Sequence, residues 1–134
     1  MITEAPNRTV PPAFDHERVL IALKAALGSA VLSGDDIPVR NEKDWSSLDP
    51  VRPLAVVRPA DTEGVAVAMR ICAAHGVAVV PQGGLTGLCG GAHPIEGCVA
   101  LSLERMTGIE EIDAAAATMT VRAGTTLELS LIHI

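Results

Sequence analysis

The stretch that decides the fold is residues 77–92, which read VAVVPQGGLTGLCGGA. It begins with four apolar residues, a run that is typical of a strand covered on both faces. Five of the nine residues from Gly83 to Gly91 are glycine, so the strand passes directly into a glycine-rich loop. Glycine gives up more backbone freedom on folding than any other residue. In return, a chain without Cβ atoms can approach a ligand closely, and neighbouring N–H groups can converge on an anion.

The loop lies in a stretch without formal charge. No Asp, Glu, Lys or Arg occurs from Ile71 to Ile95. A diphosphate bound here would meet no carboxylate, and we expect no lysine or arginine to assist it. Main-chain N–H groups and the Thr86 hydroxyl would then carry the binding, with about 1.5–3 kcal/mol for each charge-assisted hydrogen bond.

Two common nucleotide motifs do not fit this loop. The segment Gly83-Gly84-Leu85-Thr86-Gly87 lacks the GxGxxG spacing of a Rossmann fold. A Walker loop requires a lysine before Ser or Thr, and this loop contains no lysine. A glycine-rich turn that serves only tight packing remains as an alternative, because glycine occurs in turns of every kind.

The residues before the loop predict a β-α-β unit. Residues 54–58 predict a short strand, and a helix is expected to follow. Asp61 or Thr62 can cap the start of that helix, and Gly76 can end it. Residues 77–80 then supply the second strand of the unit.

The residues after the loop predict further strands. Residues 98–103 are expected to form a strand, and residues 109–113 and 118–123 are expected to form a hairpin pair, with alternation in residues 118–121. Residues 124–126 are expected to open a helix. Glu104 and Asp113 are interpreted as surface or turn carboxylates.

The N-terminal third divides into three segments. Residues 1–13 contain three prolines and predict a lead-in, and residues 15–27 have the periodicity of an amphipathic helix. Residues 33–53 predict a long connection that carries short helices. Such a length is unusual within a compact domain and indicates a functional or docking role.

Composition excludes several classes of function. The chain has 134 residues, 49% of them hydrophobic, which suits one modest domain with a core. A net charge of −6 and only two aromatic residues argue against a nucleic-acid partner. Cys72, Cys89 and Cys98 lack paired CxxC spacing, so we expect reduced thiols and no metal site. No signal peptide or run of ~20 apolar residues is evident, which predicts a cytoplasmic protein without a transmembrane segment, with peripheral membrane association left open.

Taken in order, these segments resemble the FAD-binding domain of the vanillyl-alcohol oxidase / p-cresol methylhydroxylase superfamily. The first half of the resemblance is carried by VVRP at 56–59, DTE at 61–63, VVPQGGLTGL at 79–88 and GGA at 90–92. The second half is carried by LSLERM at 101–106, ID at 112–113, TMTV at 118–121 and AGTTL at 123–127. Within the superfamily, the chain is most similar to the D-lactate, glycolate and D-2-hydroxyglutarate dehydrogenases.

The resemblance implies an α+β fold. The chain would form the first α/β subdomain of a PCMH-type FAD-binding domain, with a mixed sheet flanked by helices, and this domain would be incomplete. Residues 1–31 would be a lead-in and helix, and residues 32–128 the N-terminal part of the FAD-binding domain. Apolar residues in 129–134 fall on several faces and do not continue an amphipathic helix. We expect a truncated chain whose tail is not native sequence.

The resemblance also implies that FAD binds along this domain with its pyrophosphate over residues 81–87. The expected cofactor-binding residues are Pro81, Gln82, Gly83, Gly84, Leu85, Thr86, Gly87, Gly90, Gly91, Ala92 and Gly124. The branch often has Asn where Leu85 stands, and members with covalent flavin can use a histidine near that position. Leucine cannot form such a bond, so non-covalent FAD is expected.

The implied function is the FAD-binding portion of a 2-hydroxy-acid dehydrogenase of the D-lactate, glycolate or D-2-hydroxyglutarate type, in which hydride passes from the substrate carbon to the flavin. The substrate would bind through a domain outside this chain, which also holds the metal ligands of the branch. We therefore name no catalytic residue and no metal ligand, leave the electron acceptor open, and expect the fragment to be inactive alone. The alternatives are a non-catalytic nucleotide-binding or partner-docking module, or a flavin oxidase of another substrate class on the same fold.

Overall fold

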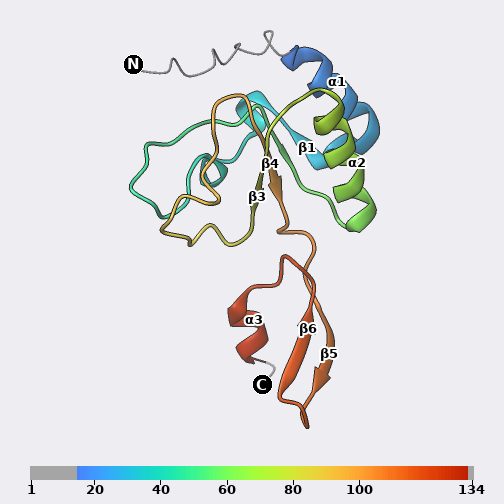
Figure 1. Ribbon diagram of the computed structural model, residues 1–134, viewed down its shortest axis with the longest axis vertical. Helices are drawn as coiled ribbons and strands as arrows, with labels where there is room; N and C mark the ends of the chain where they lie inside the picture. Colours follow the sequence, from blue (N-terminus) through green and yellow to red (C-terminus); the bar gives the residue numbers. More distant parts are fainter. Residues whose placement is uncertain (1–14, 133–134) are drawn as a thin grey trace, which may run out of the picture.

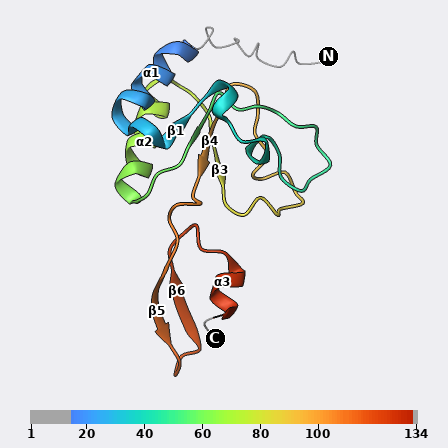
Figure 2. The same ribbon diagram turned by 180° about the vertical axis from the view of Figure 1, so that it is seen from behind.

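The computed structural model describes residues 15–132, which form a four-stranded sheet with two helices and a separate hairpin followed by a short helix (Figure 1). The helices α1 (His16–Leu27) and α2 (Thr62–Ala74) lie side by side on one face of the sheet. The view from behind shows the long loops gathered on the other side (Figure 2). No helix within these residues is both long and apolar enough to cross a membrane.

The sheet is mixed, as the family resemblance implies. Its strands are β1 (Val31–Leu32), β2 (Ala55–Val57), β3 (Val79–Gln82) and β4 (Val99–Ser102), in the order β1-β2-β4-β3. β4 pairs in parallel with both β2 and β3, whereas β1 is antiparallel to β2. β4 therefore lies between β2 and β3, the two strands of the β-α-β unit. The carboxyl ends of these three parallel strands meet at one edge of the sheet.

Both helices begin at an aspartate cap, which confirms the predicted starts. The Arg18 N–H donates to Asp15 Oδ1 at 3.2 Å, and the Gly64 N–H donates to Asp61 Oδ1 at 2.8 Å. Such a cap contributes about 1 kcal/mol by satisfying a backbone donor that has no partner within the helix. Gly76 follows α2 with a φ of 67°, a conformation that glycine adopts without a Cβ clash.

The core lies on both faces of the sheet. Val57 and Leu101 face the helices, where they join Val19 and Leu23 of α1. Alternate strand residues point the opposite way, so Val56 and Ala100 pack with Ile37 of the long connection. The connection therefore covers the second face of the sheet, as the helices cover the first.

The expectation of a doubly covered strand at residues 77–80 is wrong. The strand comprises residues 79–82, and it lies at the edge of the sheet with Val79 and Val80 only half-buried. Every residue of β2 and β4 is buried instead. An apolar run shows that a segment has buried contacts, but it does not show the position of the strand within the sheet.

The remaining elements follow the sequence closely. The predicted short helices of the long connection are η2 (Gly34–Asp36) and η3 (Val39–Glu42). The predicted hairpin consists of β5 (Ile109–Asp113) and β6 (Thr118–Val121). Asp113 is a turn carboxylate, because its Oδ1 accepts from the Ala115 and Ala116 amides.

The C-terminal residues differ from the expectation in one respect. A helix, α3 (Leu127–Ile132), does continue past residue 128, and Leu127, Leu131 and Ile132 on it are exposed. The origin of residues 129–134 stays a prediction. The lead-in of residues 1–13 and the last two residues lie outside the described part of the chain.

Candidate cofactor site

The glycine-rich loop leaves the end of β3 and has open space around its backbone. A Cβ placed on Gly83, Gly84, Gly87 or Gly91 would meet no atom within 4 Å, and none of these glycines has a positive φ. Neither packing among residues 15–132 nor backbone conformation therefore requires glycine at these positions. A ligand that approaches the main chain would require it, because a side chain would occupy the same space.

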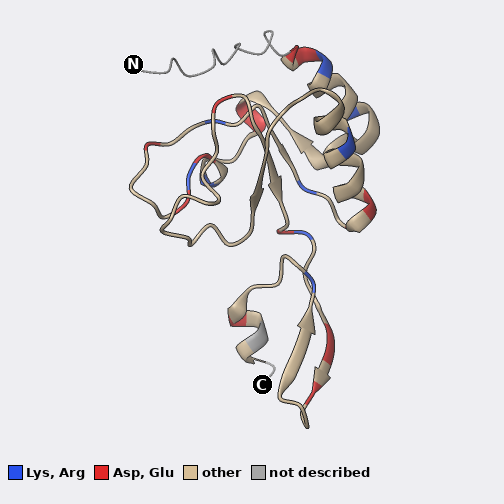
Figure 3. Cartoon of the chain, viewed as in Figure 1, with Lys and Arg blue, Asp and Glu red and all other residues tan. Residues whose placement is uncertain are grey.

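The backbone amides of residues 83–87 are available for such a ligand. Within residues 15–132, none of them donates a hydrogen bond to the protein. The same stretch carries no charged side chain, and its ribbon is tan in Figure 3. Consecutive free N–H groups without a nearby carboxylate in the same segment fit the negative oxygens of a diphosphate.

Leu85 holds an unusual conformation in this loop. Its φ is 61°, in the left-handed region, although its side chain is buried at 8% exposure. Such a backbone costs a residue other than glycine about 1–2 kcal/mol, and asparagine tolerates it better. The buried side chain offsets this strain and fixes the middle of the loop.

Three loop residues face a pocket of about 430 Å³ that also involves a distant segment. The lining residues are Gly83, Gly84, Thr86, Ala123, Gly124, Thr125, Thr126, Leu127 and Glu128. The structure therefore brings the predicted residue Gly124 beside the predicted loop. The wall is formed by the turn after β6 and the first residues of α3.

Gly124 has a packing role that does not depend on a cofactor. Its N–H donates to the Met106 carbonyl at 2.8 Å. A Cβ at this position would overlap the Leu103 carbonyl oxygen. The close approach of two main-chain segments therefore requires glycine here, and a contact with the cofactor stays a prediction.

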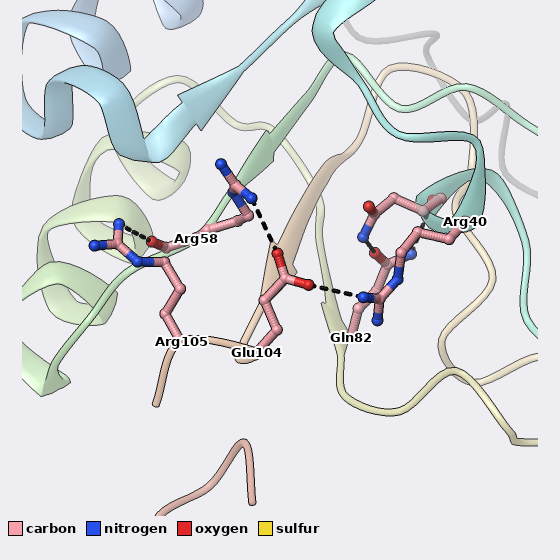
Figure 4. Close-up of polar contacts among 6 residues, drawn as sticks. Arg40, Arg58, Gln82, Glu104 and Arg105 are labelled. Atoms are coloured by element: carbon pink, nitrogen blue, oxygen red, sulfur yellow. Dashed lines mark hydrogen bonds and ion pairs between the residues drawn. The ribbon is translucent and has the colours of Figure 1, made fainter. Parts of the chain in front are cut away.

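Gln82, at the start of the loop, is fully buried and held by a partner that sequence reasoning missed (Figure 4). Asn41 Nδ2 donates to Gln82 Oε1 at 2.8 Å, and Gln82 Nε2 donates to the Asn41 carbonyl at 3.0 Å. Gln82 Nε2 also donates to the Ala92 carbonyl at 3.1 Å. One side chain thus ties both ends of the loop to η3, and its predicted contact with the cofactor stays a prediction.

The residues after η3 hold the loop at further points. The Trp45 N–H donates to the Gly87 carbonyl at 3.1 Å. Asp44 is buried, and hydrogen bonding from the Ser46 side chain is the main effect that lowers the pKa of its carboxyl group. The Ser46 and Ala92 amides and the nearby His93 lower this pKa further, against the effect of burial. The Asp44 and His93 side chains approach to 3.8 Å.

One feature of the sequence pointed indirectly to the residues that hold the loop. The long connection was expected to have a functional or docking role, and the structure shows that it packs against the loop. The polar run of residues 41–44 gave no reason to expect that Asn41 and Asp44 would be buried.

The other predicted residues lie away from the two pockets described here. Pro81 is exposed on β3, and Gly90 has a φ of 77° with its carbonyl accepting from the His93 amide at 3.2 Å. Neither pocket is lined by Pro81, Gly90, Gly91 or Ala92. Their contact with a cofactor stays a prediction.

A second pocket, of about 320 Å³, overturns one expectation about the charge around the loop. It is lined by Arg40, Lys43, Asp44, Trp45, Gly84 and Leu85. The expectation that no lysine or arginine assists at the loop considered only the residues adjacent in sequence. The fold supplies two cations from the long connection. The expectation that a diphosphate would meet no carboxylate is also wrong, because Glu128 of α3 lines the pocket of Gly83, Gly84 and Thr86.

Known proteins match both the sequence and this geometry. Residues 53–129 match the family described as "FAD binding domain". A D-2-hydroxyglutarate dehydrogenase from Xanthomonas citri pv. viticola is 43% identical over 86 residues, which cover 64% of this chain and 18% of that protein. The glycolate oxidase subunit GlcD of Bacillus subtilis is 42% identical over 72 residues, which cover 54% and 15%.

A solved structure supports the fold. The crystal structure of p-cresol methylhydroxylase with bound substrate matches with a TM-score of 0.74 and 26% identity, over 88% of this chain and 24% of that one. The chain spans less than a fifth of each curated relative named above. The family match covers more than half of the described chain, and the free amides of residues 83–87 suit the cofactor that the family binds. The chain therefore belongs to the FAD-binding domain family, on the fold of p-cresol methylhydroxylase, and its cofactor is FAD.

Proposed function

We propose that this chain is the FAD-binding part of a flavin-dependent 2-hydroxy-acid dehydrogenase, with the FAD diphosphate on the amides of residues 83–87. The observation that carries the site is the row of unpaired N–H groups beside four glycines whose missing side chains leave open space. The substrate class is supported by the names of the relatives, a D-2-hydroxyglutarate dehydrogenase and a glycolate oxidase subunit.

The chain's own residues would bind and orient the cofactor. The amides of Gly83 to Gly87 and the Thr86 hydroxyl would bind the diphosphate oxygens, and the Asn41–Gln82 hydrogen bonds would hold these donors in place. Leu85 offers no nucleophile to the flavin, which favours non-covalent attachment. When bound, FAD supplies an acceptor for the hydride from the substrate carbon.

The substrate class is tested in a longer form of the protein that includes a substrate domain. Under anaerobic conditions, D-2-hydroxyglutarate, glycolate and D-lactate are each added to the FAD-loaded protein, and flavin absorbance near its visible maximum is followed. We expect at least one of the three acids to bleach the flavin. Bleaching by p-cresol or a sugar, and by none of the acids, would contradict the proposed class while leaving the FAD site intact.

A further inference from the structure

We propose that Arg40 and Lys43 form a cationic wall over the glycine-rich loop and contribute to binding of the FAD diphosphate. The inference rests on the proposed position of the diphosphate at residues 83–87. It adds two side chains from a segment about 40 residues earlier, where sequence reasoning expected backbone donors without lysine or arginine.

The two pockets meet at one residue. Gly84 lines the pocket that it shares with Gly83 and Thr86, and it also lines the pocket that contains Arg40 and Lys43. An anion on the amides near Gly84 would therefore have the cationic pocket directly beside it. Opposite charges at such short range attract, and the attraction weakens as salt concentration rises.

Arg40 is held in place by an acidic residue that it shares with a second arginine (Figure 4). Arg40 Nη1 lies 2.9 Å from Glu104 Oε2, and Arg58 Nη1 lies 3.3 Å from Glu104 Oε1. One carboxylate thus balances two guanidinium groups, so this cluster keeps a net positive charge. Glu104 lies in the turn after β4, as the sequence indicated, and its carboxylate also bridges the two arginines.

Lys43 adds an exposed cation without an internal partner. Within residues 15–132 its ammonium forms no ion pair, and the preceding Glu42 is paired with Arg52 at 2.8 Å. Asp44 also lines the pocket, but its side chain is fully buried and bound by Ser46. Arg40 and Lys43 outnumber the one carboxylate, Asp44, among the residues that line this pocket, so the lining carries a net positive charge although the whole chain carries −6.

A diphosphate is the ligand that suits this arrangement. It carries several negative oxygens, which can contact the amides of the loop and the two cations at the same time. A hydroxy acid such as D-2-hydroxyglutarate could place a carboxylate in the cationic pocket, but it lacks the two adjoining phosphate groups whose oxygens can accept from the row of amides at the same time. Binding of ADP and of D-2-hydroxyglutarate separates these two anions.

The test measures binding of FAD and ADP to the 134-residue chain by titration calorimetry at low and high salt. Lys43→Gln removes the unpaired cation, whereas Lys43→Arg keeps a positive charge at this position. Lys24→Gln removes an exposed cation from α1 and is the matched control. We expect Lys43→Gln to weaken both ligands about threefold to tenfold at low salt and to reduce their salt dependence. Lys43→Arg and Lys24→Gln should bind like the parent.

The outcomes separate this inference from the proposed function. Equal FAD affinity and equal salt dependence for Lys43→Gln and Lys24→Gln would overturn the cationic wall and leave the loop assignment standing. Tighter binding of D-2-hydroxyglutarate than of ADP would also overturn it. A parent chain that binds neither FAD nor ADP would contradict the diphosphate site itself. Arg40→Gln is a second variant, expected to act in the same direction.

Discussion

Asn41 and Gln82 are joined by a buried hydrogen bond of 2.8 Å between their side-chain amides, across 41 positions of sequence. Through this hydrogen bond the long connection of residues 33–53 holds Gln82, the residue directly before the glycine-rich loop. Because Gln82 also donates to the Ala92 carbonyl, the same contact reaches the far end of the loop. The position of both ends of the loop therefore depends on a segment that is distant in sequence.

Asn41→Ala should destabilise the fold by about 2 kcal/mol, because it leaves the buried Gln82 Oε1 without its donor. Urea unfolding monitored by circular dichroism gives this free energy. Ser47→Ala, an exposed change in the same connection, should stay within about 0.5 kcal/mol of the parent. Similar unfolding midpoints for the two variants would show that the amide pair contributes nothing.

Gly84 and Gly124 line the same pocket, but replacing each with alanine should change the stability of the protein by different amounts. Gly124→Ala should lower the unfolding free energy by about 3 kcal/mol or more, because its Cβ overlaps the Leu103 carbonyl oxygen. Gly84→Ala should leave stability within about 1 kcal/mol, because its Cβ meets open space. Thermal unfolding of both variants measures the contrast, and a stable Gly124→Ala protein would argue against the close approach at Leu103.

Ala117→Gly should stabilise the hairpin. Ala117 has a φ of 54° in the exposed turn between β5 and β6, where glycine avoids a cost of about 1 kcal/mol. Ala115→Gly in the same turn is the matched control, since Ala115 has no positive φ and should lose stability through added chain entropy. Chemical unfolding measures the stability of both variants. A higher free energy of unfolding for Ala115→Gly than for Ala117→Gly would contradict the turn geometry.

Asp44 should make stability fall in acid. Its folded-state pKa is lowered from the ordinary value of 3.8, so its stabilising effect is fully present above the unfolded pKa and is lost as pH falls through the folded pKa. We expect the parent to be more stable than Asp44→Asn by a constant amount above about pH 5, and this difference to shrink below pH 4. The free energies of unfolding of the parent and of Asp44→Asn are measured across this pH range. A difference between them that grew in acid would contradict the lowered pKa of Asp44.

Local chemistry made much of the fold predictable. Asp15 and Asp61 cap their helices through hydrogen bonds to residues three positions later, and Gly76 ends α2 with its own backbone conformation. The hairpin was predicted from the alternation of residues 118–121, and the structure adds that Asp113 stabilises its turn. Each of these features depends on residues that are close in sequence, so the sequence specifies them directly.

The features that were missed depend on contacts between distant residues. β4 inserts between β2 and β3, and no local pattern determines this order. For the same reason, the glycine-rich loop could be found as a candidate anion site, but its partners Asn41 and Lys43 could not. They belong to a polar connection that becomes part of the site only after it packs against the loop.

The most direct test of the central claim is titration of FAD into the parent chain and into Gly84→Val, followed by flavin fluorescence. The variant should fold like the parent, because a side chain at Gly84 meets no protein atom, but it should bind FAD at least about tenfold more weakly by filling the space of the diphosphate. Ala73→Val places the same side chain at an exposed position on α2 and should bind FAD like the parent. Indistinguishable titration curves for Gly84→Val and the parent would contradict the assignment of the loop.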